Sequence, residues 1–292
     1  MAQVAGNAIQ SQKKSPRYYE NNAANDIRYA QTANFSNSLD FVGDTAITLN
    51  AKVLMNVLAD SYVVLLGTAQ VGENVEACHA LIDKRINGFL DALQKAGIPS
   101  KNCYIDFVSQ VPAFEYEVEK KLFSTTYNEV PKGFEIKKNV HVAYNDHKLL
   151  NLILTEAAKY EIYDIIKVDV VVDNIEAIND SLRQKAVRLL HKKASDYRKL
   201  GIKFDATRYQ TIAEKIGSVY PVEQYDSYTA FVNPSLSSVK KGGYNVDNAP
   251  KNQTIYYNKL PYNEFDAVIN PQVIEPVAQF YCHIQTRYVL KP

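Results

Sequence analysis

The chain lacks tryptophan altogether and contains only three cysteines and two methionines in 292 residues. The Walker, G-x-S-x-G and dinucleotide-binding motifs are absent, and so are the HExxH and Cys-x-x-Cys spacings. The enzyme and zinc-protein classes recognised by those motifs therefore find no support in the sequence. We expect no catalytic residue, no cofactor-binding residue, no metal ligand and no cofactor, and we predict that the protein is not an enzyme.

An excess of charge of one sign and a long apolar run are missing as well. A net charge of +1 and a pI near 7.6 give no electrostatic reason to expect nucleic acid as a partner. No apolar run approaches the ~18–20 residues of a membrane-spanning helix, so no transmembrane span is expected. Residues 1–38 contain no apolar stretch of a signal peptide, but their small and polar start suits a chain whose signal has been removed.

What the sequence does contain is a long amphipathic pattern over residues 175–200, which predicts a helix about 40 Å long. Lysine and arginine occupy the opposite side of this helix. Asp173 or Asn174 can cap its start, and Gly201 stands where a left-handed residue would end it. Its apolar stripe is predicted to comprise Ile175, Ile178, Leu182, Ala186, Leu189, Ala194, Tyr197 and Leu200.

The remaining patterns predict an α+β fold. Between residues 61 and 172 the order is strand, helix, strand, strand, helix, strand, which is typical of a split βαββαβ (ferredoxin-like) antiparallel sheet with both helices on one face. The long helix and C-terminal strands extend it. Strands are expected at 46–58 (whole or in two pieces), 61–71, 102–110, 134–144, 165–173, 208–220 and 277–290, helices at 73–96 and from Asn145 or Asp146 to Ala157, and connections at 111–132 and 233–271.

The chain is predicted to consist of a polar arm over residues 1–40 and one α+β domain over residues 41–292. The arm is rich in Ala, Asn, Gln and Ser and cannot bury enough apolar surface to fold alone. We expect it to contact a neighbouring subunit, so the protein is predicted to be a homo-oligomer. No linker divides the chain after residue 40.

The histidines and cysteines show no pattern typical of a metal site or a reactive thiol. His141 and His283 are expected on the wet faces of their strands, and the five histidines show no metal-ligand spacing. Cys78, Cys103 and Cys282 fall on apolar faces, where a thiol behaves as a small hydrophobe, although their number permits one disulfide in an exported protein. Gly242-Gly243 after two lysines is expected to be a turn. The other histidines are His79, His147 and His191.

Tyrosine is the one strong compositional bias, with 21 residues, many of them in expected strands. Tyrosine covers sheet faces, and it is also enriched in assembly surfaces. Both interpretations stay open from the sequence.

A series of landmarks follows in order along residues 45–292: Ala59-Asp60 before SYVVLLG, Ala96-Gly97-Ile98, Pro112, Gly133-Phe134, Asn145-Asp146 and Asn270-Pro271. In this order the chain resembles the SIMPL-domain family, exported bacterial proteins whose biochemical role is largely undefined. The resemblance implies a periplasmic or outer-membrane-associated protein. The family includes ring-forming members, and some members are linked to oxidative-stress defence. One departure is Asn50-Ala51-Lys52, where the family tends to have glycines.

Two function classes follow. The leading hypothesis is a non-enzymatic exported protein that acts as a homo-oligomeric assembly or interaction protein in envelope or oxidative-stress protection. The alternative is a small-ligand-binding or thiol-redox protein of the cell envelope. That alternative requires an exposed cysteine of lowered pKa or a deep pocket with converging polar groups.

Overall fold

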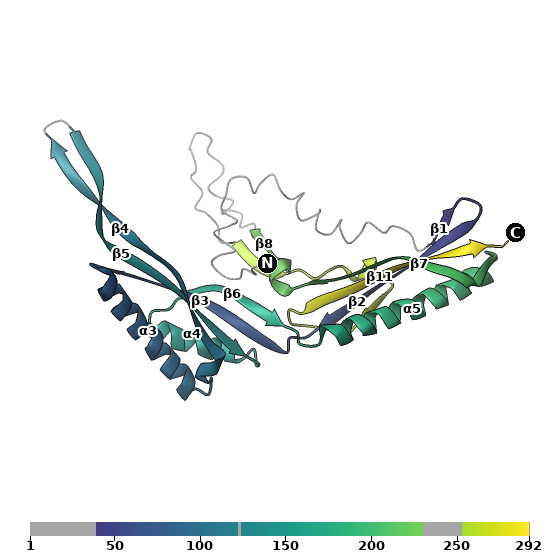
Figure 1. Cartoon of the computed structure of the whole chain (residues 1–292), viewed down its shortest axis with the longest axis horizontal. Coiled ribbons are helices and arrows are strands. Elements are labelled where there is room, and N and C mark those ends of the chain that lie inside the picture. The colour runs from purple at the N-terminus through teal and green to yellow at the C-terminus, as the bar shows by residue number, and fades with distance from the viewer. Residues whose placement is uncertain (1–38, 122–123, 230–252, 292) are drawn as a thin grey trace, which may run out of the picture. The chain divides into compact units, whose positions relative to one another are not determined.

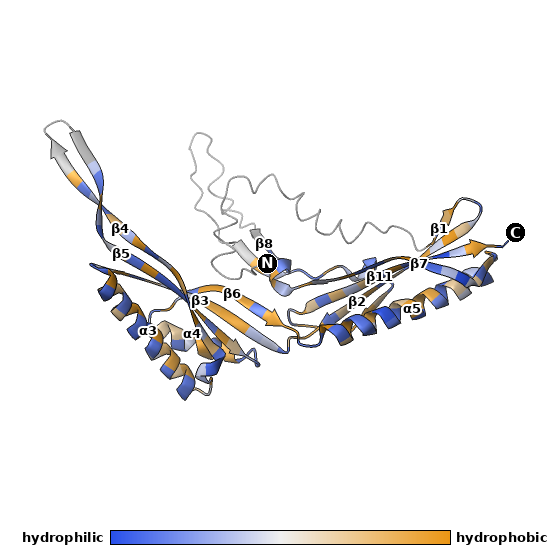
Figure 2. Ribbon diagram, viewed as in Figure 1, coloured by the Kyte–Doolittle hydropathy of each residue, from blue (hydrophilic) through white to orange (hydrophobic). Residues whose placement is uncertain are grey.

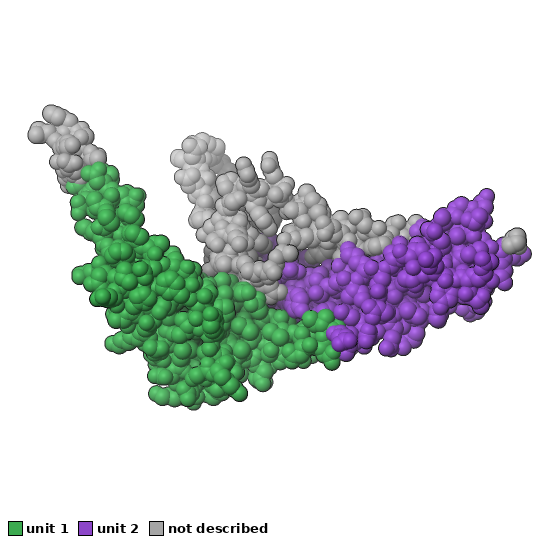
Figure 3. All heavy atoms as spheres, in the orientation of Figure 1, with its two compact units in different colours: residues 1–31, 58–175 green, residues 32–57, 176–292 purple. Residues whose placement is uncertain are grey.

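The computed structural model describes residues 39–121, 124–229 and 253–291. The predicted arm, up to residue 38, and Gly242-Gly243 lie outside the described residues. The chain divides into two compact units, shown in Figure 3. Unit 1 contains Leu58–Ile175, and unit 2 combines the described residues up to Val57 with those from Glu176 onward.

The prediction that residues 41–292 form one domain rests on the lack of a recognisable linker after residue 40 in the sequence, and it stays a prediction. The unit boundaries fall at two short connections, between the strands that end at Val57 and begin at Ser61, and between the strand ending at Val171 and the helix beginning at Ile175. Connections of three residues have no distinctive composition, so a search for linkers passes over them.

Unit 1 follows the predicted order of strand, helix, strand, strand, helix, strand, and its strands form one antiparallel sheet in the order β4-β5-β3-β6. The α+β class is therefore confirmed. The elements are β3 (Ser61–Gly72), α3 (Val75–Lys95), a 3₁₀ turn (Ser100–Asn102), β4 (Cys103–Lys121), β5 (Ser124–Tyr144), α4 (Leu149–Lys159) and β6 (Asp164–Val171).

Both helices of unit 1 lie on the same side of its sheet (Figure 1). Fully buried Ile86 and Phe89 of α3 pack in one core with Val140 and Val142 of β5. Alternate residues of β5 point into this core. The start of α4 was predicted too early, since Asp146 accepts a hydrogen bond from the Lys148 amide and so closes the turn before the helix.

The largest correction in unit 1 concerns residues 111–132, which were predicted to be a connection. Of these, residues 111–121 belong to β4 and residues 124–132 to β5, and the two strands pair as far as Lys121 and Ser124. Pro112 and Pro131 suggested a loop, but β4 is an edge strand, and β5 has no pairing with β3 on the tip side of Phe134. A proline there removes no required ladder hydrogen bond. The register also shifts between Pro112 and Phe114.

Unit 2 contains a sheet in the order β1-β2-β11-β7, with β10 parallel to β2 at the outer side. The strand expected at 46–58, whole or in two pieces, is the single strand β2. One prediction changes: the expected loop over 233–271 includes β9 and β10 in its described part. The elements are β1 (Leu39–Val42), β2 (Ala46–Val57), α5 (Ile175–Lys199), β7 (Phe204–Val219), β8 (Tyr225–Thr229), β9 (Gln253–Tyr257), β10 (Ala267–Ile269), β11 (Ala278–Leu290) and 3₁₀ turns at Pro221–Gln224 and Tyr262–Glu264; β8 and β9 form a separate pair.

The long helix α5 is confirmed, and Gly201 follows it with a φ of +95°. Its buried residues are Leu182, Ala186, Leu190 and Ala194. The prediction also placed Leu189, Ile175 and Leu200 in this stripe, whereas Leu189 is only half-buried and Ile175 and Leu200 are exposed. Four-residue steps run the whole length of the buried face, so Leu190 follows Ala186. Figure 2 shows the largely hydrophilic colouring of α5, in keeping with a helix buried along one narrow stripe.

Candidate interaction surface

The β4–β5 hairpin extends beyond the sheet of unit 1. Pairing between β3 and β5 ends where Gly72 faces Phe134, whereas β4 and β5 continue together to the turn (Figure 1). Gly133 marks this exit with a φ of +142°, and a Cβ there would lie 2.4 Å from the Gly72 carbonyl oxygen. Only glycine fits this close approach. We call residues 114–131 the hairpin tip.

One face of the hairpin tip is apolar and exposed. The pairs Phe114–Pro131 and Val118–Tyr127 flank the pair of Tyr116 with Glu129, and directly paired residues share a face. The exposed fractions are 55% for Phe114, 69% for Tyr116, 49% for Val118 and 66% for Tyr127. We call these four side chains the apolar face. No comparable cluster would be expected on a strand pair that works alone in water.

The other face of the hairpin tip is acidic. Glu115 and Glu117 alternate with the apolar residues along β4, and Lys132 reaches both carboxylates at 3.6 and 3.5 Å. All three side chains are about half exposed or more, and such surface ion pairs contribute little to stability. We call Glu115 and Glu117 the acidic face.

This alternation has a physical meaning. Antiparallel strands with an apolar and a polar face normally bury the apolar one, and two strands alone are marginally stable in water. Within the described residues nothing covers the apolar face. The tip therefore has the sequence pattern of a half-buried strand without the cover that this pattern implies.

The cysteines lie where the sequence analysis placed them, on apolar faces. All three thiols are free. Cys78 is buried and its Sγ lies 3.2 Å from the Phe134 carbonyl oxygen. Burial raises the pKa of the Cys103 thiol, and burial together with the charge of Glu214 raises the pKa of Cys282 to about 11. These surroundings disfavour the thiolate and so disfavour the thiol-redox alternative.

His283 was predicted to be wet and is buried instead. It lies in β11, which has a strand on either side, and it faces Lys52 of β2 and Lys215 of β7. Burial, followed by the charge of Lys52, lowers the pKa of His283 to about 4. Alternation along one strand could not reveal that this face of the sheet is covered.

The other histidines do not converge. His141 meets the Tyr104 ring edge-on, with 5.7 Å between ring centroids. The part of the chain that the structure describes contains no group of three His, Cys, Asp or Glu side chains that could hold a metal ion. The remaining contacts are His79 with Phe107, His191 with Tyr209 and His147 with Asp146.

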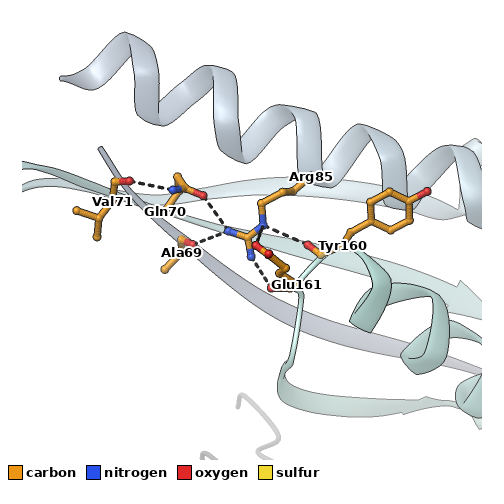
Figure 4. A network of polar contacts seen from close by, with 6 residues as sticks. All are labelled: Ala69, Gln70, Val71, Arg85, Tyr160 and Glu161. Atoms are coloured by element: carbon orange, nitrogen blue, oxygen red, sulfur yellow. Dashed lines mark hydrogen bonds and ion pairs between the residues drawn. The ribbon is translucent and has the colours of Figure 1, made fainter. Parts of the chain in front are cut away.

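Sequence reasoning missed a clasp around Arg85 of α3 (Figure 4). Its guanidinium donates to the carbonyl oxygens of Ala69, Tyr160 and Glu161 and to Oε1 of Gln70, at 2.9, 3.1 and 3.0 Å for Ala69, Tyr160 and Gln70. Arg85 thereby satisfies carbonyls at the end of α4 and joins that helix to β3. Because three of these four hydrogen bonds go to main-chain carbonyls, the clasp is structural.

A second polar cluster lies in unit 2. Gln279 donates to Asn56 at 2.7 Å, while its own carbonyl oxygen accepts from Gln224 and from the Leu260 amide, both at 2.7 Å. Asn56 in turn donates to the Tyr262 hydroxyl at 2.7 Å. These amides satisfy one another and fix the segment after β9 to the sheet, so the cluster offers no free group to a ligand.

Residues 47–254 match the model of the SIMPL family, which is described as "Protein of unknown function (DUF541)". The match covers most of the chain and confirms the resemblance stated from the sequence. No curated protein matches the chain at a significant level. Among the described helices, none is both long and apolar enough to cross a membrane.

Proposed function

Because the chain belongs to the SIMPL family, whose function is described as unknown, we propose its role from its own surfaces. The protein is a non-enzymatic subunit of a homo-oligomer, and the apolar face of the hairpin tip is a contact between copies. The observation that carries this proposal is the exposure of Phe114, Tyr116, Val118 and Tyr127 on one face of two strands.

A second copy of the chain is the simplest cover for this face. Two hairpin tips can pack apolar face to apolar face about a two-fold axis, because such a contact uses the same residues on both sides. Glu129, on the same face, can accept a hydrogen bond from a tyrosine hydroxyl of the neighbour. Tyrosine is also the residue type most suited to such contacts, since it combines apolar area with a polar end.

We further propose that the protein is exported and acts in the bacterial cell envelope, in the periplasm or at the outer membrane. This rests on the export implied by the SIMPL resemblance. A part in envelope or oxidative-stress protection belongs to the same proposal. The three cysteines lie on apolar faces, so a protective role would come from the assembly rather than from thiol chemistry.

The test is the mass of the native protein in solution, measured by light scattering or mass photometry. The wild type is expected to be larger than the 32.9 kDa of one chain. The variant F114S/Y116S/Y127S should lose mass while its circular dichroism stays unchanged, because the three side chains are exposed in the single chain. Tyr163→Ser is the matched control, since Tyr163 is 69% exposed but lies outside the tip. A wild type that is monomeric at every concentration would refute the proposal.

The N-terminal arm provides a separate prediction. Deleting residues 1–38 should leave the fold intact, because the described elements begin at Leu39 or later, but should weaken assembly. Circular dichroism and light scattering of the truncated and full chains check this. Unchanged mass and unchanged stability would show that the arm takes no part in assembly.

A further inference from the structure

The apolar face of the hairpin tip is too small to hold an assembly by itself. A fully buried aromatic side chain covers roughly 150–250 Å², so three half-exposed aromatics and a valine offer on the order of 300–400 Å². A stable interface needs about 800 Å² from each partner. If the tip is a contact between copies, as proposed above, the assembly requires a second contact surface.

The outer side of α5 is a candidate for that surface. At about 100° per residue, Lys185, Arg188, Lys192 and Lys199 fall within an arc of about 60°, whose centre lies about 150° from the centre of the buried face. They extend over about 21 Å of the helix at 1.5 Å per residue. We call these four residues the basic stripe.

Among the described residues, most of the charge of the basic stripe has no acidic partner. The helix contains seven Lys or Arg and three Asp or Glu. Two of the acids are engaged locally, Asp180 with Arg183 at 2.9 Å and Asp196 with Lys199 at 3.3 Å. Arg188 and Lys192 are exposed and form no ion pair with any described residue. An exposed basic pair of this kind suits an acidic partner.

The acidic face of the hairpin tip is complementary to the basic stripe in charge and similar to it in spacing. Glu115 and Glu117 are two residues apart on a strand, which separates them by about 6.8 Å. Arg188 and Lys192 are four residues apart on a helix, which separates them by about 6.0 Å. The present partner of the two glutamates, Lys132, is exposed and is exchanged at little cost.

We propose that the acidic face of the hairpin tip in one copy binds the basic stripe of α5 in another copy. The inference rests on the proposed homo-oligomer and identifies its second contact. When two tips pack by their apolar faces, their acidic faces remain on the outside, where an α5 helix can reach them. The contact joins two different surfaces, so, together with the two-fold contact between tips, it builds assemblies larger than a dimer.

Charge reversal tests this pairing. The hairpin-reversed variant is E115K/E117K and the helix-reversed variant is R188E/K192E. Each should weaken self-association about tenfold, while a chain containing both reversals should recover it. An equimolar mixture of the two reversed chains should form mixed complexes, because each then presents the charge that the other needs. Light scattering and mass photometry of differently tagged chains report both results.

Matched controls separate pairing from net charge. D91K/E275K and K84E/K101E make the same changes of charge at exposed positions outside both surfaces and should leave the mass unchanged. Circular dichroism checks that each variant folds. If a charge-reversed chain misfolds, the neutral variant E115Q/E117Q or R188Q/K192Q takes its place. Each neutral variant should still weaken association. Salt should weaken the wild-type contact, since screening is strong at high ionic strength.

The outcomes distinguish this inference from the proposal on which it rests. A monomeric wild type removes the homo-oligomer and this contact with it. An oligomeric wild type whose mass is unaffected by either reversal overturns the pairing alone and leaves the apolar contact standing. Recovery within a doubly reversed chain but not in the mixture would place the contact inside one subunit and overturn it as a contact between copies.

Discussion

The two halves of the β4–β5 hairpin share an alternating pattern but have different surroundings. In the half next to β3, Ile136, Val140 and Val142 are fully buried beneath α3 and α4. In the tip, Phe114 and Tyr116 alternate with glutamates in the same way and remain exposed. The difference teaches that an alternating pattern predicts one apolar face that must be buried, but does not say which segment buries it. At the tip we assign this role to a second copy of the chain.

The largest expected effect comes from truncating one aromatic in each half. Phe89 is the largest buried side chain of α3, so Phe89→Ala should lower the free energy of unfolding of unit 1 by about 3–5 kcal/mol. Phe114→Ala should change the stability of the dilute chain by less than about 0.5 kcal/mol, because its side chain is already exposed. Denaturant melts at low protein concentration compare the two. Equal losses would show that the tip is packed within the single chain.

A second comparison, between a fully buried and a half-buried leucine, can be made on α5. Leu182 is fully buried, so Leu182→Ala should cost roughly 2–5 kcal/mol through lost burial and a cavity. Leu189→Ala should cost clearly less, since Leu189 lies beside the stripe and is half-buried. Denaturant melts of unit 2 check both variants. A larger loss for Leu189 would show that the helix is rotated from the position described.

These contrasts indicate what the sequence could predict. Periodicity located the three described helices and the order of the unit 1 elements, because each depends on local apolar spacing. It misjudged residues 111–121 and 124–132, since two prolines and mixed polarity are typical of a loop and only pairing across the hairpin makes these residues strands. It chose Leu189 over Leu190 because both fit a stripe of irregular steps. Both errors concern tertiary contacts, which decide whether a segment pairs as a strand and which side chain is buried.

The candidate surface was beyond the reach of the sequence for the same reason. The series Phe114, Glu115, Tyr116, Glu117 and Val118 was visible, but its exposure depends on β3 ending before the hairpin does. The Arg85 clasp joins residues up to 76 positions apart, and no local pattern signals it. His283 was predicted to be solvent-exposed, because alternation along one strand does not show which segments cover that face of the sheet.

A smaller effect concerns His283 and pH. Burial and Lys52 lower the pKa of this histidine to about 4 in the folded protein, against about 6.5 when unfolded. The unfolded chain therefore binds the proton more readily, so stability is greatest above pH 6.5 and falls as the pH drops toward 4. The loss attributable to His283 should be about 1–3 kcal/mol. In His283→Gln this part of the pH dependence should disappear. Denaturant melts between pH 7 and pH 4 measure the free energy of unfolding at each pH. If its pH dependence is unchanged in the variant, another group is responsible for the titration.

The smallest effect compares thiol chemistry in the two halves of the hairpin. Cys103 begins β4 on the side of the core, and burial raises its pKa, so it should react slowly with a thiol reagent in the native protein. Cys78 and Cys282 should be slower still, because both are buried. A cysteine introduced by Tyr116→Cys should react at the rate of a free thiol in dilute protein. Rapid labelling of all three native thiols would contradict the burial described and revive the thiol-redox alternative.

The central claim, that another copy covers the hairpin tip, is tested most directly by hydrogen exchange at several protein concentrations. A two-stranded tip exposed to water opens easily, so its amides should exchange fast in the dilute chain. The account predicts that exchange at residues 114–118 and 127–131 slows as concentration rises, while exchange in β5 beside β3 stays constant. Exchange at the tip that is equally fast at every concentration, including those where the protein is oligomeric, would contradict the claim.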